Sequence, residues 1–345
     1  MSSRANLLFT IFDDIIPTVI NMTKYKILSI LIKEKDYISG EIISEKLGIS
    51  RAAVNSAIKN LRIEGYEIDS VTNRGYRLQT HPNHLNEGEI GAFLSDARMK
   101  TVCCLESVDS TNNHLRNLAY DGAPEGQVVI SDHQTEGKGR HGRRFESPSH
   151  SGIYLSYLLR PNTKPGSAVE ITAWTAVAVC SAIEEITGFS PDIKWINDLE
   201  SKGKKLCGIL SELSVEAESG EVKFIIVGIG VNVNENTGDF PEELVDVATS
   251  LKIETEKDVR RGELAAAIVR HMDFLKAEWP EEHEKYYEEY CKRCVTPGNR
   301  IRVITGGSEE EAYAKSIDLS FGLVVEYPDG SEKILNSGEV STRKI

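Results

Sequence analysis

The sequence has few cysteines and no pattern that would organise them. Six cysteines in 345 residues are too few for a disulfide framework. Cys291 and Cys294 form a Cys-x2-Cys pair, but neither a second such pair nor a pair of histidines completes a zinc site. We therefore expect reduced intracellular thiols, with a metal or redox role for this pair as the minor alternative.

Long apolar runs, internal repeats and low-complexity stretches are also missing. Leu7–Ile20 is the longest apolar run near the N-terminus, but Asp13, Asp14 and Pro17 interrupt it. It is too broken for a membrane span and lacks a signal-peptide cleavage pattern. We expect a cytoplasmic protein that does not enter the membrane.

Over the chain as a whole, basic residues are fewer than acidic ones. There are 40 Lys and Arg against 53 Asp and Glu, a net charge of −13. This balance disfavours nucleic acid or an anionic membrane as a partner of the whole molecule. The charge is uneven, however, because residues 22–80 carry +3 and residues 81–345 carry −15. A weakly basic N-terminal module therefore precedes an acidic body.

The N-terminal module has the pattern of a winged helix-turn-helix. Apolar spacing predicts a helix over Thr23–Glu34, and Ser39 is placed to cap a second helix that ends at Gly48. Ser50 is placed to cap a third helix, and two short strands follow around the turn 72–75. Two helices about a glycine turn, followed by a hairpin, are typical of this fold. Residues 1–21 fit it poorly, so they are an amphipathic extension or, as we favour, the result of a start codon assigned upstream of Met22.

The body alternates strands and helices, which predicts a central mixed α/β domain. We expect strands over 126–134, 152–159, 193–196, 205–216 and 221–232, a helix over 168–186, and a helical segment over 261–292 broken at Pro280. After Pro297 only short β segments remain, and they predict a five-stranded barrel of about 50 residues.

A glycine-rich basic loop, Gly137–Phe145, is the sharpest chemical feature. Three glycines prevent a stable helix or strand, and four Lys and Arg side chains lie within an otherwise acidic domain. Such a loop suits phosphate, because backbone N–H groups approach closely and Arg offers paired donors. A solvated basic loop or a nucleic-acid contact are the alternatives.

Further polar segments occur where α/β domains place ligands. Asp109–Asn112 stands between a strand and a helix, although its side chains could simply cap that helix. Gln134 ends the strand that enters the basic loop. Lys194–Asp198, Lys205–Leu210 and Gly228–Asn232 follow at strand ends.

In this order the segments closely resemble the biotin protein ligases. The N-terminal module, through Ser39–Glu41 and Gly48–Asn55, resembles the DNA-binding head of the bifunctional members, the biotin-operon repressors. Leu335–Ser341 is similar to the family's SH3-like C-terminal barrel. The resemblance implies three domains: a winged helix-turn-helix over 22–80, a catalytic domain over 81–294 and an SH3-like domain over 295–345.

The resemblance also implies a reaction and a set of site residues. ATP with Mg²⁺ would activate biotin as biotinyl-5′-AMP, and a lysine of a biotin carboxyl carrier domain would then accept the biotin. The residues that it assigns to biotin are Ser110, Thr111, Asn112, Gln134, Lys138, Gly139, Arg140, Lys205 and Gly208. Those that it assigns to ATP are Gly137, Arg143, Phe145, Asn197, Asp198 and Asn232, with Lys205, Arg140 and Lys194 as catalytic cations and Asp198 as a magnesium ligand.

Three positions depart from the common family pattern. Lys138 replaces an arginine, Phe145 a tryptophan and Ile196 a proline. Lysine retains the charge but loses the paired donors, and phenylalanine retains a smaller stacking face. We expect these changes to tune affinity, since Arg140 and Lys205 are retained.

In the head, the third helix and the wing offer residues that suit operator DNA: Ser50, Arg51, Asn55, Ser56, Lys59, Asn60 and Arg74. A net charge of +3 means weak binding by one copy, so we expect a homodimer when ligand is bound. A protein-binding winged helix is the alternative for the head. For the whole chain the alternatives are a transcription regulator with a degenerate ligase body, and a lipoate or octanoyl transferase.

Overall fold

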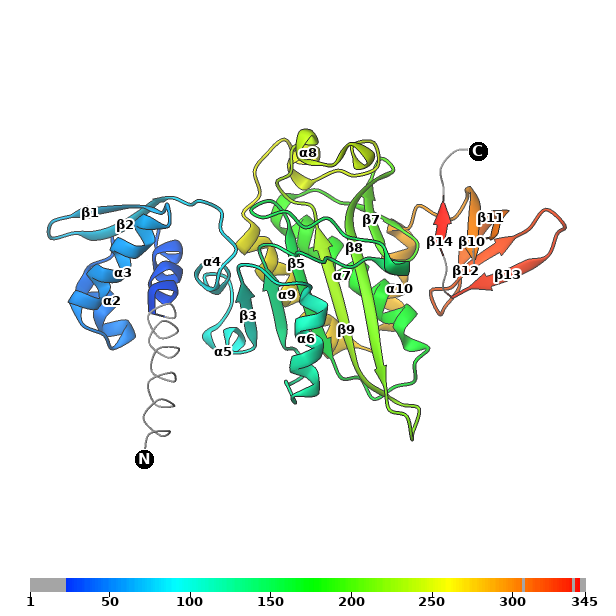
Figure 1. Cartoon of the computed structure of the whole chain (residues 1–345), viewed down its shortest axis with the longest axis horizontal. Coiled ribbons are helices and arrows are strands. Elements are labelled where there is room, and N and C mark those ends of the chain that lie inside the picture. The colour runs from blue at the N-terminus through cyan, green and yellow to red at the C-terminus, as the bar shows by residue number, and fades with distance from the viewer. Residues whose placement is uncertain (1–22, 306–307, 337–338, 342–345) are drawn as a thin grey trace, which may run out of the picture. The chain divides into compact units, whose positions relative to one another are not determined.

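The computed structural model describes residues 23–305, 308–336 and 339–341. The expected extension over residues 1–21 lies outside this range, as does part of the Leu335–Ser341 motif. The chain divides into two compact units between Cys104 and Leu105, and Figure 1 labels most elements of both.

The first unit contains the expected helix-turn-helix and wing. Residues 23–33 are helical, and α2 (Gly40–Leu47), α3 (Arg51–Ile63), β1 (Glu67–Val71) and β2 (Gly75–Thr80) follow. The Ser39 and Ser50 hydroxyls accept hydrogen bonds from the amides of Ile42 and Ala53, as N-caps do. The predicted capping serines and the helix-turn-helix are therefore confirmed. Two short helices, α4 (Glu87–Gly91) and α5 (Asp96–Met99), complete this unit.

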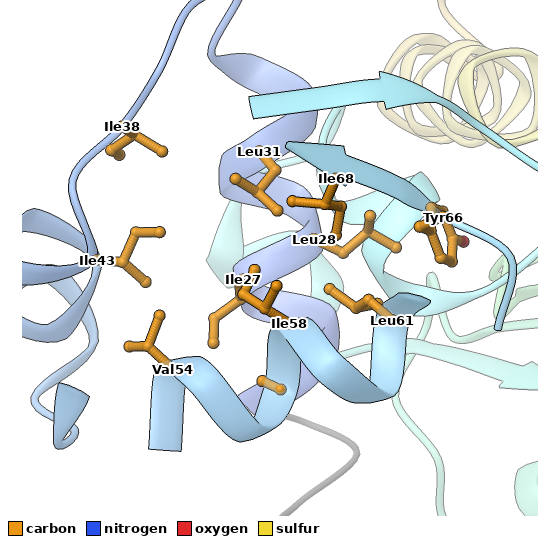
Figure 2. Close-up of a cluster of buried hydrophobic side chains, with 11 residues drawn as sticks. Ile27, Leu28, Leu31, Ile38, Ile43, Val54, Ile58, Leu61, Tyr66 and Ile68 are labelled. Atoms are coloured by element: carbon orange, nitrogen blue, oxygen red, sulfur yellow. The ribbon is translucent and has the colours of Figure 1, made fainter. Parts of the chain in front are cut away.

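One apolar cluster holds the head together, as Figure 2 shows. The helix over 23–33, α2, α3 and the wing all contribute buried side chains to it, among them Ile27, Leu31, Ile43, Ile58 and Ile68. The wing is also tied to the chain before α2, because Ile38 and Tyr76 exchange two backbone hydrogen bonds of 2.9 and 2.8 Å. Gly75 permits this approach: it has φ +103°, and a Cβ there would lie 2.0 Å from the Ile38 carbonyl oxygen.

A large sheet forms the centre of the second unit. Within this unit the strand order is β4-β5-β9-β8-β7-β6, and every neighbouring pair is antiparallel. These strands are β4 (Val128–Ser131), β5 (Ile153–Leu159), β6 (Asp192–Lys194), β7 (Asp198–Ser201), β8 (Lys204–Val215) and β9 (Val222–Val231), while β3 (Val102–Leu105) includes the boundary between the units. The predicted β8–β9 hairpin through Gly220 is confirmed, whereas the strand expected over 126–134 is shorter, because the chain bends at Asp132.

Helices cover both faces of this sheet, and neighbouring residues of β5 show which helix covers which face. Ser156 donates to side chains of α6 (Thr111–Tyr120), whereas Tyr157 donates to Asp273 of α9 (Arg261–Glu278). Successive side chains of a strand point to opposite faces. Thus α6 lies on one face and α9 on the other, where α7 (Ser167–Thr187) packs against it.

Helix α7 is long and apolar enough to cross a membrane by length and composition, but 67% of its most apolar window is buried within the structure. The shorter α8 (Leu251–Thr255) follows β9, and α10 (His283–Arg293) follows α9 after the break predicted at Pro280.

The C-terminal segment is an antiparallel sheet of five strands in the order β13-β12-β11-β10-β14, which fits a small barrel. These strands are β10 (Arg300–Thr305), β11 (Ser308–Ile317), β12 (Leu323–Glu326), β13 (Glu332–Leu335) and β14 (Glu339–Ser341). All six cysteines are described and none forms a disulfide, as expected.

Candidate active site

Glycines form the floor of a pocket on the α6 face of the large sheet. Gly208 of β8 lies opposite Gly230 of β9, and Gly228 lies in the next row of the same face. A Cβ at Gly228 would lie 2.4 Å from Asn112 Oδ1, and one at Gly230 would lie 2.6 Å from the Phe145 ring. The glycines therefore leave the space into which these two side chains project.

The N-terminal end of α6 forms one wall of the pocket. Ser110, Thr111 and Asn112 are at most 3% exposed. Ser110 occupies the N-cap position of α6, yet its side chain makes no capping hydrogen bond, and its Oγ has no hydrogen-bond partner within the described chain. A buried hydroxyl without a partner costs about 1–3 kcal/mol. The simple capping role considered for this serine is therefore wrong, and its hydroxyl remains available to a ligand.

Gln134 links this wall to the basic loop, and its hydrogen bonds fix the orientation of its amide. Its Oε1 accepts from the backbone N–H and the hydroxyl of Thr111 at 2.9 and 3.1 Å, so its Nε2 must donate, and it does so to Ser147 Oγ at 3.0 Å. A Cβ at Gly137 would lie 2.6 Å from Ser147 Oγ and 2.3 Å from the Phe145 carbonyl oxygen. Glycine at position 137 thus lets the loop approach Gln134.

Four polar side chains run along the other side of the pocket. Arg140 Nη1 donates to Asn197 Oδ1 at 2.8 Å, and Asn197 Nδ2 donates to Asp198 Oδ1 at 3.1 Å. Lys205 Nζ donates to the same Asp198 oxygen at 2.7 Å. The Asn197 amide and the Asp198 carboxylate therefore connect Arg140 of the basic loop to Lys205 of β8. Because the Lys205 side chain is 39% exposed, its charge remains accessible to an anion.

Lys138 is held beside the wall by an asparagine of α6. Its Nζ donates to Asn113 Oδ1 at 2.6 Å, and Asn113 Nδ2 donates to Asp109 Oδ2 at 2.6 Å. Partial burial opposes ionisation of Asp109, but the hydrogen bonds from Asn113 and the backbone, with the nearby Lys138 charge, hold its pKa below the ordinary value. Asp109 is thus an ionised anchor at the start of α6.

The phenyl ring of Phe145 fills much of the pocket. The ring lies within contact distance of the Cβ positions that Gly208 and Gly230 lack. The free volume that remains is about 50 Å³, far below the roughly 300–1,000 Å³ of small-molecule sites. A ligand larger than a few atoms would therefore have to displace the Phe145 ring.

A second and larger cavity, of about 340 Å³, shares Gln134, Phe145 and Lys205 with the first. Pro148, Phe240, Pro241, Leu244, Val247 and Ala248 give it an apolar lining, and Asn232 and Glu235 also line it. Glu235 is 2% exposed and its Oε2 has no hydrogen-bond partner within the described chain. Burial raises the pKa of Glu235 above its ordinary value.

The structure brings together every residue that the resemblance assigns to biotin: Ser110, Thr111, Asn112, Gln134, Lys138, Gly139, Arg140, Lys205 and Gly208 line the first cavity. Of the residues assigned to ATP, Phe145 and Asn197 line the first cavity, and Phe145 and Asn232 line the second. Gly137 and Asp198 contact residues of the lining, and Arg143 is exposed on the loop.

Lys194 is not among the residues that line either cavity. It lies opposite Asp198 in the β6–β7 pair, next to the pocket. As for a metal, no three His, Cys, Asp or Glu side chains group as ligands in the part of the chain that the structure describes. Asp198, the residue assigned to Mg²⁺, is bonded to Lys205. A single carboxylate suits Mg²⁺ only when phosphates and water supply the other ligands.

The expected DNA-contacting residues of α3 are on its outer side. Arg51, Asn55, Ser56 and Lys59 are exposed and Asn60 is half-buried, while Ser50 serves as the cap. Asn55 is not free, because its Oδ1 accepts from Tyr76 of the wing at 2.6 Å.

Arg74 of the wing is engaged as well. Its guanidinium lies 4.3 Å from the centre of the Tyr37 ring and 3.4 Å from Asp36. Arg77 stacks on the same ring at 4.7 Å. Sequence reasoning missed this packing of two wing arginines on Tyr37, because no local pattern links them.

These features define a class: a protein with a helix-turn-helix unit and a unit whose sheet carries a glycine-floored pocket beside a basic loop. Comparison with known proteins agrees. The profile of the biotin/lipoate A/B protein ligase family matches residues 104–232, and that of an HTH domain matches residues 23–77. The bifunctional ligase/repressor BirA of Bacillus spizizenii is 36% identical over 315 residues, which cover 88% of this chain and 93% of that protein. The chain therefore belongs to the family of bifunctional ligase/repressors.

More distant relatives extend the same likeness. BirA of Escherichia coli is 28% identical over 94% of this chain and 98% of its own length. Among solved structures, the biotin protein ligase of Aquifex aeolicus in complex with biotin and ATP matches with a TM-score of 0.61 at 28% identity. That match covers 71% of this chain and 99% of the solved one.

Proposed function

We propose that this protein is an ATP-dependent biotin protein ligase that is also a biotin-responsive transcriptional repressor. The observation that carries the ligase proposal is the first cavity, where an unpartnered Ser110 hydroxyl and the oriented Gln134 amide lie opposite Lys205 and Arg140. A buried slot of donors and acceptors suits a cyclic urea, and two cations at its other end suit a carboxylate and a phosphate.

In the first step, a carboxylate oxygen of biotin bonds to the α-phosphorus of ATP. The bond from that phosphorus to the bridging oxygen of pyrophosphate breaks, which yields biotinyl-5′-AMP and pyrophosphate. The two reactants are both anions, so their approach requires positive charge that is already in place. Lys205 and Arg140 supply it, held by Asp198 and Asn197.

In the second step, the amine of a carrier-domain lysine attacks the acyl carbon of the anhydride and loses a proton as AMP leaves. The basic loop retains the anhydride and keeps water from it until the carrier arrives. Lys138, anchored on Asn113, and Arg140, bonded to Asn197, are the loop side chains that close over it.

The second cavity is our proposed place for the adenosine moiety. It adjoins the first through Phe145 and Lys205, and its apolar lining suits a flat base. Asn232 would contact the nucleotide there, with Phe145 against the ring. Mg²⁺ bound with ATP would neutralise part of the triphosphate charge, and Asp198 is the carboxylate that we assign to it. Lys194 would add to the positive field from the neighbouring strand.

The repressor proposal depends on the head. The exposed residues of α3 are polar or basic, which suits base edges and phosphates. With a net charge of only +3 over residues 22–80, one head would bind DNA weakly, so a homodimer is proposed as the DNA-binding form. We also propose that the C-terminal sheet is an SH3-like barrel.

The experiment that tests the ligase proposal uses the full chain with ATP, Mg²⁺ and a biotin carboxyl carrier domain. Biotin, lipoate or octanoate is supplied as the acid, and mass spectrometry reads the modified carrier. Only biotin should be attached, at a single lysine. Attachment of lipoate or octanoate would favour the transferase alternative, and no attachment of any acid would favour a regulator without ligase activity.

A further inference from the structure

Arg116, on α6, is bonded to the sheet and to a neighbouring residue of its own helix beside the candidate pocket, although it does not line the cavity. One of its nitrogens lies 2.7 Å from Glu212 of β8, and the other donates to Asn113 at 3.1 Å. We propose that Arg116 is a positioning residue, which fixes Asn112 on the pocket wall through Glu212 and Lys138 of the basic loop through Asn113. The inference rests on the proposed function, because it assumes that Asn112 and Lys138 contact the ligand.

The wall branch supplies the shorter of the two hydrogen bonds that Asn112 Nδ2 donates, the longer being to the Leu210 carbonyl oxygen at 3.4 Å. Glu212 Oε1 pairs with Arg116, and Glu212 Oε2 accepts from Asn112 Nδ2 at 2.7 Å. An ionised carboxylate only accepts hydrogen bonds, so the Asn112 amide must turn its NH2 group to Glu212 and its oxygen away. That oxygen accepts from Ser156 at 2.5 Å and lies in the space left by Gly228.

The loop branch holds Lys138 at the edge of the pocket. Asn113 Oδ1 accepts from Arg116 at 3.1 Å and from Lys138 Nζ at 2.6 Å. Asn113 Nδ2 donates to Asp109 on the other side, so both ends of this amide are fixed. The branch thus gives the basic loop a defined docking point on α6.

The geometry requires arginine at position 116. Its planar guanidinium reaches two acceptors at once, which a lysine ammonium on a flexible chain does not reproduce. The Arg116 and Glu212 side chains are 30% and 27% exposed, so breaking the pair costs more stability than breaking a surface pair and less than breaking a fully buried one. The Tm of each variant is therefore measured beside its kinetics, and we expect folded variants with altered ligand binding.

Three variants separate the two branches. Glu212→Gln should raise the KM for biotin about tenfold, since it releases the orientation of Asn112, and should leave the KM for ATP within about twofold. Asn113→Ala should increase the rate at which biotinyl-5′-AMP escapes by about tenfold, since it releases Lys138. Arg116→Met should change both quantities, because it removes the shared residue.

Arg270→Met is the matched control. Arg270 pairs with Glu185 at 2.5 Å, is 33% exposed, and lies on α9, on the opposite face of the sheet. This variant should match the wild type in both measurements. If the Arg116→Met variant also matches the wild type, the positioning role is wrong. The same holds if this variant raises the KM for ATP as much as the KM for biotin. Absence of adenylate formation by the wild-type protein would instead contradict the proposed function.

Discussion

At the scale of single residues, Lys205 carries the largest share of the proposed chemistry. Its ammonium is the partly exposed cation between the two cavities, 2.7 Å from Asp198. Lys205→Ala should slow biotin-dependent pyrophosphate release by about 10²–10³-fold, as the loss of a charge that stabilises the transition state does elsewhere. The exposed pair with Asp198 is worth at most about 1 kcal/mol to folding, so the Tm should change little. Near-normal pyrophosphate release by a folded variant would contradict the assignment.

A substitution at Gly228 tests whether the floor of the pocket requires glycine. Gly228→Ala places a Cβ 2.4 Å from Asn112 Oδ1, which must move the side chain away from its position. We expect a higher KM for biotin, by about tenfold or more. Gly166→Ala is the control, since nothing lies within 4 Å of its Cβ position. Equal kinetics for the two variants would mean that the floor does not require glycine.

A substitution at Glu235 tests how the buried carboxyl of the second cavity affects the pH dependence of stability. Burial raises its pKa in the folded protein, so the folded state binds more protons than the unfolded state above the ordinary pKa. The free energy of unfolding should therefore fall as the pH rises from about 4.5 through the raised pKa. Glu235→Gln should reduce this fall, as measured by urea unfolding between pH 5 and 8. An unchanged pH dependence would show that Glu235 finds a partner for its charge.

Some residues of the site could be predicted from the sequence and some could not. Ser110, Gln134 and Lys205 stand in recognisable motifs, and the structure brings them to one cavity. Ser147 and Glu212 escaped prediction, because a serine in a polar stretch and a glutamate in a strand carry no local signal. Their importance arises only from the hydrogen bonds that they accept from Gln134 and Asn112.

At the scale of elements, we expect the basic loop 137–145 to determine whether the anhydride is retained. Its ends are joined by the hydrogen bond from Phe145 N to the Gly137 oxygen, at 2.9 Å, and Arg140 within it donates to Asn197 at 2.8 Å. Arg140→Gly should let biotinyl-5′-AMP escape and acylate nearby lysines on unrelated proteins. The measurement is biotin labelling of serum albumin added to the reaction. Labelling confined to the carrier domain would contradict the retention role.

The elements themselves were predicted well where apolar periodicity and caps agree, as in α2, α3 and the β8–β9 hairpin. No strand was predicted over the residues of β7 or β14, and the strand expected over 193–196 is found as β6, which ends at Lys194. Both β7 and β14 are strands of three or four residues, too short for an alternating pattern to emerge. The contact of Trp195 was also not predicted from the sequence. Its indole N–H donates to the Phe321 carbonyl oxygen at 2.8 Å, which connects the segment Lys194–Asp198 to the C-terminal sheet. No local pattern indicates such a contact between distant segments.

At the scale of the whole molecule, we predict that ligand binding and dimerisation are coupled. The basic loop should be disordered without ligand, since glycines lose much entropy on ordering and like charges repel. The anionic biotinyl-5′-AMP would offset both the entropy cost and the charge repulsion. The ordered loop would then complete a dimer surface, so that ligand binding and dimerisation are coupled by about 1–3 kcal/mol. Sedimentation with and without biotinyl-5′-AMP measures it. An association constant that ligand does not change would leave the ligase proposal intact and remove the switch.

The central claim is that the pocket joins biotin to AMP. Its most direct test is to incubate the full chain with biotin and ATP, without any carrier domain, and to analyse the protein-bound small molecules by mass spectrometry. We expect biotinyl-5′-AMP bound to the protein and pyrophosphate in solution, both dependent on biotin. Recovery of unreacted biotin and ATP, or an adenylate formed equally well from lipoate, would contradict it.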